Sequence, residues 1–349
     1  MVGFIVKLLI LTNMGAKPSA PFQGVFVRNQ VAALSALAPV FFQMNWQTDR
    51  MPWRYLRYPV FWCQFVWRHV FSRSSFDLIH VHFYYPTIWL ALTYKLLRNP
   101  KVKIVVTCHG GDLYFYDPPS ALYRLCSRVV DHWVFVSEQL RQRFFRRDIS
   151  AEVLPAGIHP VYGDVTPLTL AQKDIDLLYV GTLDLNKGMD RLVALLAQLP
   201  GLRVVVIGHG PWLSQLQQAQ SDYPGLELLG AKSPAELAEY YRRSKVYLNL
   251  SRNESFGLVM TEAMACGTPV VASQTDGAQA QVTDGENGFV VQQQELLPMA
   301  AALAAKIQLL FSKSAAEYQQ IQQRCRTSAQ PYLLGKIASR LQTIYQSLL

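Results

Sequence analysis

Glu254 and Glu262 flank a turn that contains Gly257, and this arrangement is the strongest chemical signal in the sequence. The segment after the turn has the apolar spacing of a helix and is ended by Gly267, so we predict a helix that begins near residues 256–258. The start of a helix offers N–H groups without intrahelical acceptors and a partial positive charge, which together suit a phosphate. The turn is therefore a candidate anion site with one glutamate on each side.

Two carboxylates have little reason to bind a diphosphate, because like charges repel. They suit hydroxyl groups that flank the diphosphate and donate hydrogen bonds. A nucleotide sugar has this layout, with ribose hydroxyls on one side of the diphosphate and sugar hydroxyls on the other. Glu254 and Glu262 thus predict a nucleotide-sugar clamp, although the spacing alone is equally compatible with an ordinary amphipathic helix whose glutamates are solvated.

The elements around these glutamates follow an alternating pattern. Short β-rich runs such as 103–109 and 202–208 alternate with segments of helical spacing, which is typical of a parallel sheet with crossover helices. The pattern stops near residues 160–172 and then begins again. We therefore predict an α/β protein with two doubly wound domains, followed by a helical tail with breaks at Pro298 and Pro331.

Composition sets bounds on the class of protein. Half of the 349 residues are hydrophobic, which is enough for two cores, and the net charge of +9 favours a nucleic acid, an anionic membrane surface or a phosphorylated substrate as partner. Five scattered cysteines without a C-x-x-C pair indicate a reduced, cytosolic protein. The apolar run at residues 1–15 is interpreted as a buried strand rather than a signal peptide, and no apolar run is long enough to span a membrane.

Several motifs in fixed order resemble the GT-B fold glycosyltransferases of family 4. Glu254 and Glu262 with the intervening SFG resemble the E-x7-E signature of that family, and the resemblance covers roughly residues 1 to 295. The other matching segments include PFQGVFVRNQVAAL, DLIHVHFYYP, TCHGGDLY, VLPAGIHP, LLYVGTLDLNKGMDRLVALLA and TDGENGFVV. The resemblance implies two Rossmann-like domains that face a central cleft: an acceptor-binding domain at residues 1–165 and a nucleotide-sugar-binding domain at 166–330. The C-terminal helix at 331–349 is expected to pack back on the first domain.

The resemblance assigns roles to the residues of the glycine turn. Glu254 is expected to face the hydroxyls of the donor sugar, and Glu262 is expected to face the ribose. The backbone N–H groups of Phe256, Gly257 and Leu258 would bind the diphosphate. These assignments make Glu254 a candidate catalytic residue and the whole turn a donor-binding element.

Other candidate residues follow from the same resemblance. Lys187 matches the lysine that neutralises the leaving diphosphate. The uncharged Thr182 stands where the family commonly has an arginine. His109 is expected near the reacting anomeric carbon, and the acceptor-side candidate Asp112 either holds the imidazole tautomer or caps the next segment. Gly24 either lets the backbone approach the donor phosphate or acceptor, or simply forms a turn.

Two further patterns bear on metal use and sugar preference. Asp174 and Asp176 match the D-x-D metal signature of the other large glycosyltransferase fold, but their place before a strand favours a loop at the start of a domain. We therefore predict no metal and no cofactor. The family's G-G-x-x-E loop is altered here at Asp276, Gly277 and Ala280, so the donor sugar does not follow from the resemblance.

The segment at residues 41–75 combines many aromatic side chains with a net positive charge, which suits a bilayer interface with anionic headgroups. A pair of core helices with solvated arginines explains it equally well, and no nucleic-acid motif accompanies it. The basic residues that define this segment are Arg50, Arg54, Arg57, Arg68 and Arg73.

These observations favour a retaining, metal-independent hexosyltransferase that moves a sugar from a nucleotide diphosphate, UDP or GDP, to a hydroxyl acceptor. The expected acceptor is a lipid-linked or cell-surface glycan precursor, of polysaccharide or lipopolysaccharide type, with the protein in the cytoplasm and peripheral on the inner face of the membrane. A soluble small-molecule acceptor and a degenerate, non-catalytic sugar-binding scaffold are the alternatives. A nicotinamide-dependent oxidoreductase is disfavoured, because no G-x-G-x-x-G follows the first strand.

Overall fold

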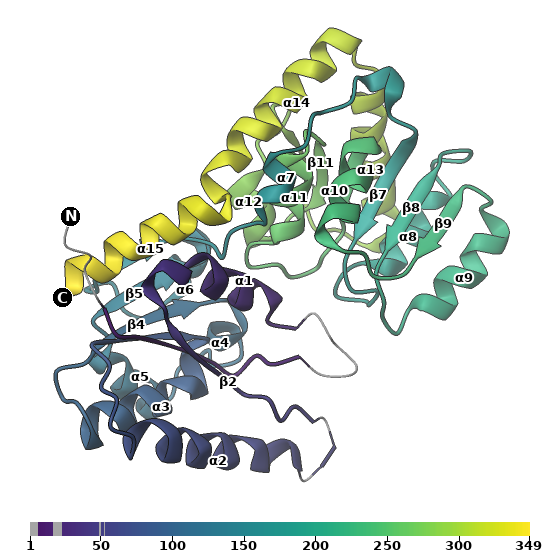
Figure 1. Ribbon diagram of the computed structural model, residues 1–349. Coiled ribbons are helices and arrows are strands. Elements are labelled where there is room, and N and C mark those ends of the chain that lie inside the picture. Colours follow the sequence, from purple (N-terminus) through teal and green to yellow (C-terminus); the bar gives the residue numbers. More distant parts are fainter. Residues whose placement is uncertain (1–5, 17–22, 49, 52) are drawn as a thin grey trace. The chain divides into compact units, whose positions relative to one another are not determined.

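The computed structural model describes residues 6–16, 23–48, 50–51 and 53–349. It divides the chain into two compact units, coloured along the sequence in Figure 1. Unit 1 comprises Met1–Gly157 and Leu334–Leu349, and unit 2 comprises Ile158–Leu333. The expected boundaries were 165 and 330, whereas these units divide the chain after Gly157 and after Leu333.

Unit 1 is built on a parallel sheet, which has six strands over the described residues in the order β2-β1-β3-β4-β5-β6. In the register of three neighbouring strands, Ile10 lies beside His80, and His80 lies beside Val105. The strands are β1 (Leu8–Thr12), β2 (Val40–Gln43), β3 (Leu78–His82), β4 (Lys103–Cys108), β5 (His132–Phe135) and β6 (Ala151–Val153). The helices are α1 (Val25–Ala33), α2 (Trp53–Phe65), α3 (Tyr84–Leu97), α4 (Gly111–Tyr114), α5 (Ala121–Cys126), α6 (Glu138–Arg143) and α15 (Leu334–Leu348).

Unit 2 repeats this architecture with a second parallel sheet, six-stranded within the described part of the chain, in the order β12-β11-β10-β7-β8-β9. Its strands are β7 (Ile175–Val180), β8 (Val204–Ile207), β9 (Leu226–Leu229), β10 (Ser244–Asn249), β11 (Val270–Ser273) and β12 (Gly288–Val291). Its helices are α7 (Pro160–Gly163), α8 (Met189–Leu196), α9 (Leu213–Asp222), α10 (Pro234–Arg243), α11 (Leu258–Ala265), α12 (Asp276–Gln281), α13 (Leu296–Phe311) and α14 (Ala315–Ala329).

Strands β1, β3, β8 and β11 are buried along their whole length, as is expected of parallel strands covered on both faces. Their β-branched residues form the cores of the two units. The α/β fold class with two Rossmann-like domains is thus confirmed. The edge strands β2, β6 and β12 were not predicted, because each has only three or four residues and gives a weak signal.

The C-terminal helices differ from the prediction at one proline. Pro298 does not break a helix. It lies in the first turn of α13, where a proline costs no helical hydrogen bond. Pro331 lies in a 3₁₀ turn (Gln330–Tyr332) between α14 and α15. Helix α15 packs on the sheet of unit 1, where Leu341 and Tyr345 are buried in the same core as Ile10.

Among the described residues, no single helix has both the length and the apolar character needed to cross a membrane. One bent pair, Leu296–Phe311 with Ala315–Tyr332, satisfies length and hydropathy when taken together, with an angle of 112° at the break.

Candidate active site

The glycine turn of unit 2 connects β10 to α11, and the helix begins as the sequence predicts. Gly257 precedes the helix in a left-handed conformation with φ 79°. A Cβ at this position would lie 2.8 Å from Cε of Met260 and 2.9 Å from Cγ of Glu254. Both the backbone conformation and the space therefore require glycine.

Lys187 and Glu254 are far apart in the sequence, and the fold brings them together. The Lys187 ammonium donates a hydrogen bond to the Glu254 carboxylate, and the two side chains are 27% and 16% exposed. The backbone of the lysine is held by Asp184: the N–H of Lys187 donates a hydrogen bond to Oδ1 of Asp184 at 2.8 Å. The next residue, Gly188, has φ 76°, and a Cβ there would lie 2.2 Å from the carbonyl oxygen of Leu250. A cation and an anion thus meet beside the glycine turn.

Helix α12 braces the turn from the other side. The N–H of Gly277 donates to the Glu254 carbonyl oxygen at 2.8 Å, and the Gln281 side-chain amide donates to the Phe256 carbonyl oxygen. A Cβ at Gly277 would lie 2.2 Å from that same oxygen of Phe256. The Phe256 ring is buried, with its centroid 5.3 Å from that of Tyr332. These bonds occupy carbonyl groups, so the N–H groups of the turn can point elsewhere, and the role of Gln281 has no signal in the sequence.

Glu262 lies on α11 and is held by two tyrosines that the sequence analysis did not identify. The hydroxyl of Tyr241, on α10, donates to Oε2 of Glu262 at 3.0 Å, and Tyr162 of α7 also bonds to this carboxyl. Burial raises the pKa of Glu262 from 4.5 to about 7, although the hydrogen bonds from Tyr241 and Tyr162 act in the opposite direction. The carboxyl is therefore oriented in the free protein and changes charge near neutral pH.

Thr182 is exposed, and its carbonyl oxygen accepts a hydrogen bond from the Tyr179 hydroxyl at 2.8 Å. The nearby arginines are engaged elsewhere. Arg252 pairs with Asp190, with 2.6 Å between Nη2 and Oδ2. The buried Arg191 donates to the carbonyl oxygen of Leu250 at 3.0 Å. The position of the family arginine is thus taken by a neutral residue.

The D-x-D pair at the start of β7 is engaged in structural contacts. Asp174 pairs with Arg203 and Arg243, and Asp176 pairs with Lys245 at 2.7 Å. These contacts lie at the amino end of the strand, whereas ligands in doubly wound folds bind beyond the carboxyl ends. Within the residues that the structure describes, no group of three or more His, Cys, Asp or Glu side chains is placed to hold a metal.

A second group of candidate residues, centred on His109, lies in unit 1 at the carboxyl ends of β3 and β4. Nε2 of His109 is 3.0 Å from Nδ1 of His82, and the His109 ring lies 4.5 Å from the Phe83 ring and 5.0 Å from the Phe26 ring, between centroids. Burial, and then the neighbouring His82, lower the pKa of His109 well below its ordinary value. His109 is consequently neutral at physiological pH.

Behind this pair, His80 is buried between Tyr345 and Thr107, with its ring nitrogens 2.6 Å and 2.7 Å from the two hydroxyl oxygens. Burial also lowers the pKa of His82 to about 3. Sequence reasoning treated this segment only as a strand. The available signal was the spacing of His80 and His82, because residues two apart on a strand point to the same face.

Asp112 supports the loop that carries His109. Its Oδ1 accepts hydrogen bonds from the N–H groups of His109 and Gly110 at 3.0 and 2.9 Å, and its Oδ2 accepts one from the N–H of Tyr84 at 2.8 Å. Burial raises the pKa of Asp112 to about 6, while these three bonds oppose the increase. These bonds go to the loop before Asp112 and to the start of α3, whereas α4 itself has no side-chain cap.

Gly24 forms the start of α1 with φ 70°, and a Cβ there would lie 2.4 Å from the carbonyl oxygen of Met14. The glycine therefore allows the loop after β1 and the start of α1 to approach closely. Phe26, two residues later, contacts the His109 ring. Gly24, Phe26 and His109 consequently lie at the end of the unit 1 sheet where its strands have their carboxyl termini.

Two units, each built on a doubly wound parallel sheet, are the architecture of the GT-B class of fold. The model described as "Glycosyl transferases group 1" matches residues 166–329, and the model described as "Glycosyltransferase Family 4" matches residues 43–161. The chain therefore belongs to the GT-B glycosyltransferases of family 4.

Similar proteins agree with this assignment. A D-inositol 3-phosphate glycosyltransferase of Xylanimonas cellulosilytica is 36% identical over 174 residues, which are 44% of this chain and 42% of that protein. Matches to two other curated relatives span 64% and 34% of their lengths.

Solved structures agree as well. Sucrose-phosphate synthase from Thermosynechococcus elongatus has a TM-score of 0.79 at 23% identity, with 98% of this chain and 99% of that chain covered. Anabaena Alr3699/HepE in complex with UDP and glucose has a TM-score of 0.73 at 16% identity, with 98% and 100% covered. At these identities the structural likenesses establish the fold.

Proposed function

We propose that this protein transfers a sugar from a nucleotide diphosphate to a hydroxyl acceptor, with retention of the anomeric configuration and without a metal. The observation that carries the proposal is the Lys187–Glu254 pair beside the Gly257 turn. A solvated lysine and a solvated glutamate would not need the glycines that hold this pair in place. A degenerate scaffold is disfavoured for the same reason.

In this proposal, unit 2 binds the donor. The N–H groups at the start of α11 bind the diphosphate, and Lys187 moves from Glu254 to the phosphate oxygens, where its charge stabilises the leaving group. Glu254 is then free to accept a hydrogen bond from a sugar hydroxyl. Glu262, already oriented by Tyr241, accepts hydrogen bonds from the ribose. UDP is a candidate for the nucleotide of the donor, because the similar Anabaena structure is a complex with UDP.

Unit 1 binds the acceptor in the same proposal. A neutral His109 can accept a hydrogen bond from a hydroxyl of donor or acceptor without adding charge near the reacting carbon. The sequence shows no obvious enzymic nucleophile apart from the clamp glutamates. A front-face displacement assisted by the leaving diphosphate therefore suits this site better than a covalent intermediate.

Nucleotide binding tests the donor site directly. We expect UDP or GDP to bind the wild type in isothermal titration, and Glu262→Ala to weaken that binding at least tenfold, since about 1.4 kcal/mol corresponds to a factor of ten. The exposed Glu286 supplies the matched control, Glu286→Ala, which should bind like the wild type. EDTA should leave binding and donor turnover unchanged. Equal binding by both variants would refute the assignment of the clamp.

The acceptor is proposed to be a lipid-linked glycan precursor that the protein reaches from the membrane surface. Large side chains are exposed on α2, on the π-helical turn after it (Val66–Val70) and at the residue that follows: Tyr55 is 65% exposed, Trp67 78% and Phe71 73%. Among the described residues, Arg54 and Arg68 form no ion pair with a carboxylate. Exposed aromatic rings beside these arginines suit an anionic interface.

Flotation with anionic liposomes tests this surface. The wild type should float at low salt, and Trp67→Ser should float markedly less, because it removes apolar contact without changing the charge. The exposed Leu297, in unit 2, gives the control Leu297→Ser, which should float like the wild type. A wild-type protein that stays unbound at low salt would contradict the membrane proposal and leave a soluble acceptor as the alternative.

A further inference from the structure

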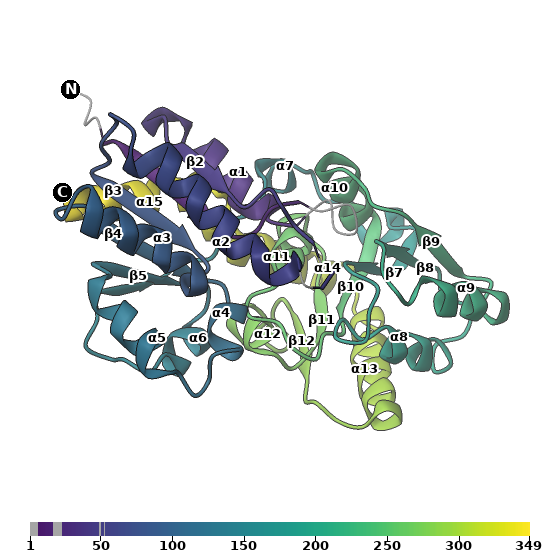
Figure 2. The same cartoon turned by 90° about the horizontal axis from the view of Figure 1, so that it is seen from below.

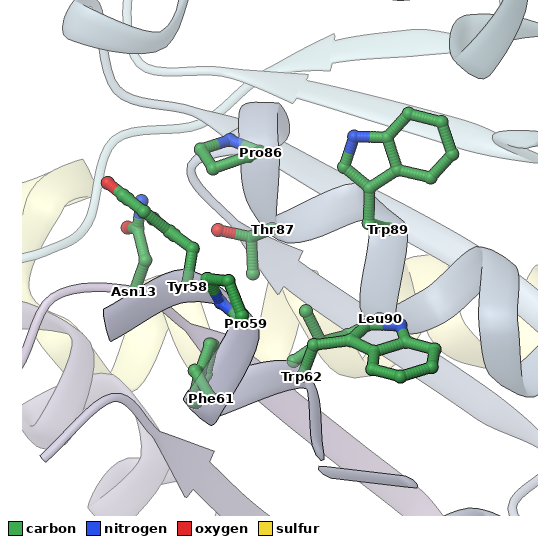
Figure 3. A pocket seen from close by; sticks show the side chains of 9 residues that line it. All are labelled: Asn13, Tyr58, Pro59, Phe61, Trp62, Pro86, Thr87, Trp89 and Leu90. Carbon is green, nitrogen blue, oxygen red and sulfur yellow. The ribbon is translucent and has the colours of Figure 1, made fainter. Parts of the chain in front are cut away.

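A pocket of 220 Å³ lies in unit 1 between α2 and α3, beside the end of β1. Figure 3 shows its lining, and Figures 1 and 2 both show α2 and α3 side by side. None of the roles assigned above uses it. Its lining residues are Asn13, Tyr58, Pro59, Phe61, Trp62, Pro86, Thr87, Trp89 and Leu90.

Two polar atoms in this lining are buried without a hydrogen-bond partner among the described residues: Oδ1 of Asn13 and Oγ1 of Thr87. Thr87 is only 2% exposed. In Figure 3 its hydroxyl points toward the side of the pocket where Asn13 and Tyr58 lie. A buried polar atom without a partner costs about 1–3 kcal/mol, and most such atoms in proteins have a partner. The pair therefore indicates a missing ligand with hydrogen-bonding groups.

The chemistry of these two atoms restricts the ligand. The Asn13 oxygen only accepts hydrogen bonds, whereas the Thr87 hydroxyl can donate or accept. Among the residues that the structure describes, the lining contains no lysine or arginine, so a phosphate or carboxylate would find no charge there to pair with. Arg57 precedes the lining residue Tyr58 in the chain. Its guanidinium donates hydrogen bonds to the Tyr58 hydroxyl at 3.2 Å and to the Gln47 side-chain oxygen at 3.1 Å. The ligand should be neutral and carry hydroxyl groups.

The rest of the lining is apolar and mostly aromatic. The indole N–H of Trp62 is already satisfied by Thr93 at 2.8 Å, which leaves the ring as an apolar wall. A hydrocarbon chain would suit such walls but would leave Asn13 and Thr87 unpaired. The volume is well above the roughly 30 Å³ of one water molecule and below the about 300–1,000 Å³ of sites for drug-sized ligands. These dimensions fit a single ring.

We propose that this pocket binds a neutral sugar ring of the acceptor. The hydroxyls of the ring would donate to Asn13 and share a hydrogen bond with Thr87, while its C–H face packs against the aromatic walls. This inference rests on the proposed transferase function. The pocket and His109 belong to one frame within unit 1, because Asp112 bonds both to the His109 N–H and to the N–H of Tyr84 at the start of α3.

Saturation-transfer NMR on the full-length protein tests the proposal. The probes are the methyl glycosides of glucose, galactose, mannose and N-acetylglucosamine, with farnesyl phosphate as a lipid probe and UDP as a probe of unit 2. We expect at least one glycoside to bind, and Thr87→Val, which keeps the shape of the side chain, to weaken its binding about tenfold or more. Asn13→Leu should have the same effect. The exposed Thr343 in α15 supplies the control, Thr343→Val, which should bind glycosides like the wild type.

The outcomes separate this proposal from the function on which it rests. Thermal unfolding that is the same in wild type, Thr87→Val and Asn13→Leu shows that both variants are folded, and equal UDP binding shows that unit 2 is intact. If UDP binds but no glycoside does, or if only farnesyl phosphate does, the sugar pocket is refuted and the donor site stands. Equal glycoside binding by Thr87→Val and the wild type also refutes it. If glycosides bind through Thr87 and no nucleotide binds, the transferase proposal fails and the pocket survives as a sugar site.

Discussion

Replacing Glu262 by glutamine should make the protein more stable and at the same time weaken its binding of nucleotides. Burial raises the pKa of this carboxyl from 4.5 to about 7, so its ionisation is unfavourable in the folded state. At 1.36 kcal/mol per pH unit of difference, that change corresponds to about 3 kcal/mol of lost stability once the group is ionised. Glutamine removes the charge and keeps an oxygen that can accept from Tyr241.

The pH dependence gives this prediction its sign. Because the folded pKa is above the unfolded one, the folded state holds a proton that the unfolded state releases between pH 4.5 and about 7. The cost of ionisation is absent below pH 4.5 and complete above pH 7. The advantage of Glu262→Gln should therefore be near zero at pH 4.5 and grow to about 1–3 kcal/mol at pH 8, with the lower end allowing for partial solvent exposure.

Calorimetry at several pH values measures this difference. For a unit of this size, about 1–3 kcal/mol corresponds to an increase in Tm of roughly 2–10 °C at pH 8. The control is Glu286→Gln, since Glu286 is exposed and should show little change at any pH. Isothermal titration at pH 8 should show weaker nucleotide binding by Glu262→Gln. If the variant is less stable than the wild type by the same amount at pH 5 and pH 8, the carboxyl is not an ionised, buried group and the reasoning is wrong.

Three further predictions concern the rest of the site. Lys187→Met should lower turnover about 10²–10³-fold, as expected for loss of a group that stabilises the leaving charge, whereas the exposed Lys336→Met should leave turnover unchanged; similar rates for both would contradict the role of Lys187. Gly257→Ala should lower Tm and weaken nucleotide binding together, because the added Cβ meets Met260 at 2.8 Å and the φ of 79° is strained for alanine by about 1–3 kcal/mol; a normal Tm with normal binding would show that the turn tolerates a side chain. His109→Gln should spare nucleotide binding and reduce turnover, and the wild-type rate should show no step from this residue between pH 6 and 8, since its pKa lies well below 6.5; a rate that falls with an apparent pKa near 6.5 in the wild type alone would indicate a charged histidine instead.

Most of the secondary structure could be read from local sequence. The helix after Gly257 begins and ends where its glycines predict, and the buried central strands coincide with the β-branched runs. The exceptions have local reasons: the edge strands β2, β6 and β12 are only three or four residues long, and Pro298 occupies a helix turn that tolerates proline. The site was harder to predict, because Tyr162, Tyr241 and Gln281 lie outside the motif and contact it only through the fold.

The sequence by itself determined the class of fold and the positions of the chemical groups. Periodicity and glycine placement are local properties, and they are set by backbone sterics and by the burial of apolar side chains. Only the tertiary structure decided which groups meet and in what state of charge. The Lys187–Glu254 pair, the raised pKa of Glu262, the neutral His109 and the unpartnered oxygens of Asn13 and Thr87 all depend on burial and on neighbours distant in the chain. Desolvation and hydrogen bonding act through space, so they become visible only when the chain is folded.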